Sequence, residues 1–105
     1  MKKRLRKKLR AGEFTVYGAA YDLTLNAAED LENLIGDIVE FVEDNGGTYA
    51  GGYSDSTIAR CFVELGTTGE DPAGRRVAVL EWLKKHAAIA SVNAGELEDS
   101  AEFFI

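Results

Sequence analysis

The chemically most distinctive part of this sequence is a basic run at its N-terminus. Residues 1–10 contain no acidic residue and seven basic ones: Lys2, Lys3, Arg4, Arg6, Lys7, Lys8 and Arg10. Closely spaced cations suit an array of phosphates, because each contact releases counterions condensed on the nucleic acid. The arginines among them favour RNA, since guanidinium pairs with phosphate in bidentate geometry and stacks on bases. We therefore predict that these seven side chains contact RNA and not DNA.

The rest of the chain has the opposite charge. Beyond residue 10 there are five basic residues against eighteen acidic ones, a formal charge of −13. An acidic surface repels RNA, so the basic run is the part of the chain electrostatically suited to bind phosphate. A run of this kind also serves as an address signal, or as a tail that folds back on an acidic body. The charge pattern alone leaves these alternatives open.

Residues suited to catalysis or metal binding are sparse. His86 is the only histidine, and we expect it to be solvated at the end of a helix. Cys61 is the only cysteine, and we expect a packed thiol with only Arg60 nearby to lower its pKa. The many carboxylates between residues 29 and 44 are typical of a solvated helix face. We predict no catalytic residues, no metal site and no cofactor.

Length and cysteine content point to one small domain in a reducing compartment. The chain has 105 residues, and a single cysteine excludes an internal disulfide, so we expect a cytoplasmic location. Between Arg10 and Asp22 no continuous apolar segment resembles a signal peptide, and no stretch approaches the length of a membrane span. We therefore expect no membrane partner.

Residues 1–12 are expected to form a flexible arm, and residues 13–105 a single α+β domain. Leu5 and Leu9 would share one side of a helix, but so short a like-charged segment is largely unfolded on its own. From Glu13 to Leu25 the pattern alternates and predicts a strand. Its inward residues are Tyr17, Ala19, Tyr21, Leu23 and Leu25, with Asp22, Thr24 and Asn26 on the other side.

Two helices and three more strands follow. Helical spacing from Ala27 to Asp44 predicts an amphipathic helix that ends at Asn45-Gly46-Gly47. Thr48–Tyr53 and Thr57–Leu65 form an expected hairpin with its turn at Ser54-Asp55-Ser56. Asp71 as N-cap and Pro72 begin the second helix, and a final strand is expected over Ser91–Leu97. The predicted inner side of the second helix consists of Ala73, Val77, Leu80, Leu83 and Ala87, with Trp82 toward a flank.

This order is β-α-β-β-α-β, which predicts a ferredoxin-like sandwich with two helices on one face of a four-stranded antiparallel sheet. Such a fold names no function. In RNA-recognition domains of this topology, outward aromatic residues of the third strand stack on bases. Here Phe14, Arg60 and Phe62 would face outward, although Ala59 and Arg60 replace the glycine and first aromatic of that motif. Contact through the sheet face is therefore a secondary hypothesis.

The segment Arg4-Leu-Arg-Lys-Lys-Leu9, followed by Glu13-Phe14 and Gly18, resembles the start of the YggL family of bacterial proteins. Further matches lie at Gly52-Tyr53, Glu64-Leu-Gly66, Glu81-Trp82-Leu83 and Glu96-Leu97, so the resemblance covers essentially the whole chain. The C-terminal end departs from the family pattern, because Phe103-Phe104 follow a longer acidic stretch where a tryptophan pair would be expected.

The resemblance implies association with the large (50S) ribosomal subunit. Under this hypothesis the arm contacts rRNA and the body contacts ribosomal proteins, in ribosome assembly or translation. It implies no catalytic residues. The alternative, from a different class, is a regulatory domain of ferredoxin-like topology that senses a small molecule, with the basic arm incidental.

Overall fold

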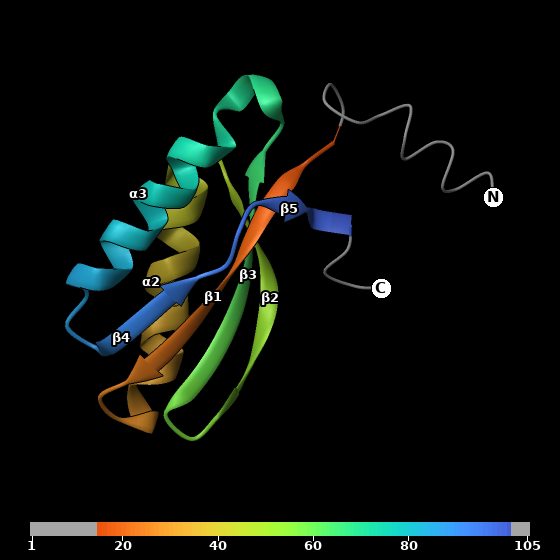
Figure 1. The fold of residues 1–105 in the computed structure, drawn as a ribbon. Helices are drawn as coiled ribbons and strands as arrows, with labels where there is room; N and C mark the ends of the chain where they lie inside the picture. The colour runs from red at the N-terminus through yellow and green to blue at the C-terminus, as the bar shows by residue number, and fades with distance from the viewer. Residues whose placement is uncertain (1–14, 102–105) are drawn as a thin grey trace.

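The computed structural model describes residues 15–101, and Figure 1 shows a mixed α+β architecture in which both helices cover one face of a twisted sheet. Residues 1–14 and 102–105 lie outside the described part, so it does not test the predicted arm, Phe14 or Phe103-Phe104. The elements, in chain order, are β1 (Tyr17–Leu25), η1 (Ala28–Asp30), α2 (Leu31–Asp44), β2 (Thr48–Asp55), β3 (Ile58–Gly66), η2 (Thr68–Glu70), α3 (Pro72–Lys85), β4 (Ile89–Ala94) and β5 (Glu98–Asp99).

All strand pairs are antiparallel, and the order across the sheet is β2-β3-β1-β4. The short strand β5 also pairs with β1, with Asp99 opposite Tyr17. The expectation of a four-stranded sheet therefore missed one strand. The predicted final strand Ser91–Leu97 is wrong at both ends, because β4 runs from Ile89 to Ala94. Beyond it, the Gly95 N–H still donates to the Ala20 carbonyl of β1 at 2.7 Å.

The core lies between the helices and the inner face of the sheet. The alternation predicted for the first strand is confirmed from Ala19 to Leu25, since the inward residues of this part are buried and Asp22 and Thr24 are exposed. It fails at Tyr17, which is only half-buried because the register shifts between Tyr17 and Gly18. The strand β3 alternates in the same way. The other buried apolar side chains of the core are Leu34, Ile38 and Val42 of α2, Ala59, Cys61, Val63 and Leu65 of β3, Val79 and Leu83 of α3, and Ile89 of β4.

The predicted inner side of the second helix is partly wrong. Leu83 is buried and Leu80 packs against the core, but Val77 is 49% exposed while Val79 is only 3% exposed. Ala73 and Ala87 are exposed too. The reason is that Arg76 occupies the inward side between Pro72 and Val79, an arrangement that apolar periodicity does not reveal.

Local signals at the element ends are mostly confirmed. The Asp71 side chain accepts a hydrogen bond from the Gly74 N–H at 3.1 Å, and Pro72 is the first residue of α3. Gly46 adopts a left-handed φ of 85°, as glycines that end helices commonly do. The hairpin turn is at Ser56-Thr57, not at Ser54-Asp55-Ser56, because both strands extend further than predicted.

We expect the substitution Val79→Ala to lower the free energy of unfolding by about 2 kcal/mol, because it removes two buried methyl groups. The matched substitution Val77→Ala, two residues earlier on α3, should cost less than about 0.5 kcal/mol, since its side chain is half exposed. Urea denaturation followed by circular dichroism measures both. A larger loss for Val77→Ala would contradict the observed orientation of α3.

Candidate nucleic-acid interface

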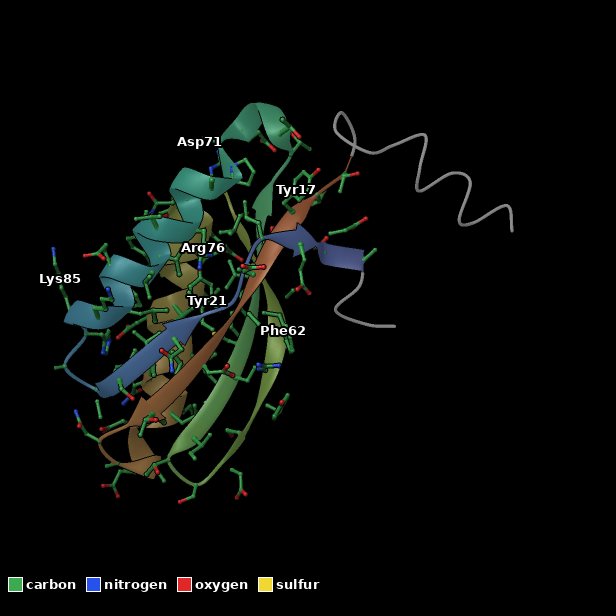
Figure 2. The ribbon with its side chains drawn as sticks, viewed as in Figure 1. Tyr17, Tyr21, Phe62, Asp71, Arg76 and Lys85 are labelled. Carbon is green, nitrogen blue, oxygen red and sulfur yellow. The ribbon has the colours of Figure 1, made fainter. Side chains whose placement is uncertain are left out.

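The outer face of the sheet carries the two described residues that the sheet-face hypothesis named. Figure 2 shows Phe62 on the side of the sheet away from the helices, opposite to Tyr21. Arg60 and Phe62 alternate along β3 with the buried Cys61, and Phe62 lies opposite Ala20 of β1 and Gly51 of β2. The predicted outward orientation of Arg60 and Phe62 is confirmed. Whether this face contacts RNA stays a prediction.

Arg60 is engaged by a carboxylate on the neighbouring strand. Its Nε donates to Oδ1 of Asp22 at 2.6 Å and its Nη2 to Oδ2 at 3.0 Å, which is a bidentate pair. These hydrogen bonds lower the pKa of Asp22 and raise the pKa of Arg60. Tyr53 and Glu98 also act on Arg60 electrostatically. The guanidinium is therefore already paired within the protein.

The charge of the outer face disfavours phosphate. Asp22, Glu64 and Glu98 lie on or beside the same face as Arg60, as the strand register shows. Among its described residues, this face therefore carries several carboxylates and one cation, which is already paired. Aromatic stacking at Phe62 would have to overcome this repulsion.

The remaining arginines of the described part hold elements of the fold together. Nη1 of Arg75 donates to the carbonyls of Gly46 at 3.1 Å and Leu65 at 3.0 Å. Nε of Arg76 donates to the Gly95 carbonyl at 2.7 Å. The Tyr21 hydroxyl, whose pKa is raised by burial, donates to the Arg76 carbonyl at 3.0 Å. Sequence reasoning missed these roles, because the acceptors are backbone carbonyls that leave no trace in residue type.

Few positive groups of the described part remain available for phosphate. Residues 15–101 hold five basic and sixteen acidic residues, a formal charge of −11. Besides the three arginines there are Lys84, which lies 3.5 Å from Glu81, and Lys85 at the end of α3. The seven basic residues of the predicted RNA-contacting set lie outside the described residues.

His86 is not merely solvated, as its position had suggested. Its Nδ1 accepts a hydrogen bond from the Ala88 N–H at 3.1 Å, and Nε2 lies 3.0 Å from Oδ2 of Asp37. The ring also lies 5.2 Å from that of Trp82, which in turn stacks on Phe41 at 4.9 Å. The histidine therefore joins the end of α3 to α2. Its partner Asp37 is 49 residues away in the sequence, so no local signal could have indicated the contact.

The prediction of a packed Cys61 is confirmed. The thiol is 3% exposed, and burial raises its pKa to about 12. A protonated, inaccessible thiol is a poor nucleophile. Within residues 15–101 no group of three or more His, Cys, Asp or Glu side chains is arranged to hold a metal ion.

Comparison with known families agrees with the resemblance seen in the sequence. The family model described as YggL 50S ribosome-binding protein matches residues 3–101. The chain belongs to this family. The match begins within the basic run and extends beyond β5, so the family relationship includes both the arm and the body. No curated protein and no solved structure matches the chain.

The name of the YggL family supports binding to the large ribosomal subunit, without specifying rRNA or protein. No helix among residues 15–101 is long and apolar enough to cross a membrane.

Replacing Asp22 by Asn should destabilise the protein by about 0.5 kcal/mol near neutral pH, because the pair with Arg60 is half exposed and screened by solvent. Asp22 has a lowered pKa in the folded state, so its contribution is present above the ordinary carboxyl value of about 4 and is lost as the pH falls through the lowered value. Urea titrations at several pH values test this. A difference between the two proteins that stays constant into acid would contradict the pairing.

The Cys61 thiol should resist alkylation by iodoacetamide at about pH 9 in the native protein, although an ordinary thiol is substantially ionised there. In denaturant the same thiol should react at the rate of a model peptide. Mass spectrometry of timed samples measures both rates. Fast labelling of the native chain would show that the interior between β3 and the helices is open.

Proposed function

We propose that this protein is a non-catalytic factor that binds the large ribosomal subunit through contacts between its basic arm and rRNA phosphates. The observation that carries this proposal is the division of charge within a chain of the YggL family. Seven cations are concentrated in residues 1–10, whereas the arginines of the described body are paired with Asp22 or with backbone carbonyls. We therefore assign the phosphate contacts to the basic residues of the arm.

The acidic body has a different role in this proposal. With a formal charge of −11 over residues 15–101, it would turn away from bare rRNA and toward basic ribosomal proteins. Such a factor would act in the cytoplasm, in ribosome assembly or in translation. The strand order β2-β3-β1-β4, with both helices on one face, supports a ferredoxin-like arrangement to which β5 is an addition.

The small-molecule sensor is the weaker candidate. One apolar cavity of about 100 Å³ lies between α2, β2 and β3. Pockets that enclose drug-sized ligands commonly measure roughly 300–1,000 Å³. The cavity is therefore small for a metabolite, although it can receive a single side chain. A shallower hollow of about 270 Å³ beside Asp30, Asn33 and His86 also falls below this range.

Replacing the seven basic residues of the arm by glutamine should lower the affinity for purified 50S subunits at least about tenfold at low salt, because their counterion release is lost. The slope of log affinity against log salt concentration should flatten as well. Co-sedimentation at several salt concentrations measures both. A matched control changes Lys84 and Lys85 of α3 to glutamine and should retain the salt dependence. Unchanged binding by the arm variant would refute the role of the arm.

A further inference from the structure

The apolar cavity lies where the covering layer of helices meets the edge of the sheet. Its walls come from one side of α2, from β2 and from the inner face of β3, and include Leu31, Ile35, Ile38, Tyr49, Ala59 and Cys61. Figure 1 shows β2 as the outermost strand on this side of the sheet. A cavity in this position can receive a side chain from a segment that lies along the strand.

The adjoining strand is suited to receive such a segment. Among the described residues, β2 pairs only with β3, which leaves its outer edge without a described partner strand. The pairing is irregular between Tyr49 and Gly51, whereas the register is continuous over Gly52–Asp55. Three residues of this continuous part, Gly52, Tyr53 and Ser54, also line the cavity. The strand has no lysine or proline, the residues that commonly protect an edge.

The charge around the groove specifies the occupant. Residues 23–59, which include α2 and β2, contain eight acidic residues and no basic one. The next residue, Arg60, also lines the cavity, but its guanidinium is paired with Asp22. Asp55 ends β2 and alternates with Tyr53, so it lies on the outer face of the strand. An apolar groove in so acidic a region repels nucleic acid and attracts a lysine-rich or arginine-rich protein segment.

We propose that the groove between α2 and β2 binds an extended basic segment of another protein by strand addition to Gly52–Asp55. Alternate side chains of an added strand point to opposite faces. One row of side chains of the added strand enters the cavity. The other row lies on the outer face beside Tyr53, which is 67% exposed. Lysine or arginine residues of this outward row pair with Asp55, which alternates with Tyr53 along β2. This inference builds on the proposed function, in that a protein of the large subunit supplies the segment while the arm contacts rRNA.

Fluorescence anisotropy of a labelled synthetic peptide of alternating lysine and valine tests the groove in the intact chain. The substitution Asp55→Lys should weaken binding about fivefold. The matched control, Glu81→Lys on α3, makes the same charge change outside the groove and should alter the affinity less than about twofold. Equal losses in the two variants would show non-specific attraction and would overturn the proposal.

Two further measurements test the apolar part and the strand. The substitution Ile35→Phe places a larger side chain at the half-buried wall of the cavity and should weaken the valine peptide but not a peptide of alternating lysine and serine. Circular dichroism checks that each variant is folded. Hydrogen exchange should show new protection within Gly52–Asp55 when the valine peptide binds. Absence of this protection would overturn strand addition.

The basic arm of the chain itself is the competing occupant. If the arm-neutralised variant binds the peptide more tightly and loses protection of Gly52–Asp55 in the absence of peptide, the arm occupies the groove and the proposal is overturned. Failure of the arm to bind rRNA gives a different result, namely unchanged 50S co-sedimentation of the arm variant with peptide binding intact. The two proposals can therefore fail separately.

Discussion

The distribution of charge constrains everything that this protein can bind. The described body has a formal charge of −11, and its three arginines satisfy an aspartate or backbone carbonyls. Releasing any of them for phosphate would leave a carboxylate or a carbonyl without its charged donor. The body of this YggL family member is therefore suited to basic partners, and we propose the basic arm as the part that contacts RNA.

The two helices are held to the sheet differently. The helix α3 is fixed by Arg75, which bridges the end of α2 and the end of β3, and by Arg76, which reaches the end of β4. The buried Tyr21 hydroxyl adds a third polar contact. Beside β2, α2 leaves an apolar cavity instead. This difference places the open groove at the acidic edge of the molecule.

Much of the fold could be predicted from local patterns. Period-two alternation located β1 and β3, helical spacing located α2, and Asp71-Pro72 located the start of α3. The inner side of α3 and the short strand β5 could not be predicted. Arg76 is polar yet lies on the inward side, because carbonyls from β4 and its following loop accept its hydrogen bonds. A two-residue strand such as β5 is too short to show an alternating pattern, and it is recognised only by its pairing with β1.

Residue type and spacing encode the charge division, the order of the main elements, the buried Cys61 and the resemblance to the family, so each could be inferred before the fold was known. The pairing of Arg60 with Asp22 and the contact of His86 with Asp37 come from the folded arrangement instead. The tertiary structure also places the apolar cavity next to the outer edge of β2, which has no partner strand among residues 15–101. The Arg60–Asp22 and His86–Asp37 contacts join residues 38 or more positions apart, so they form only when strand register and helix packing bring distant segments together.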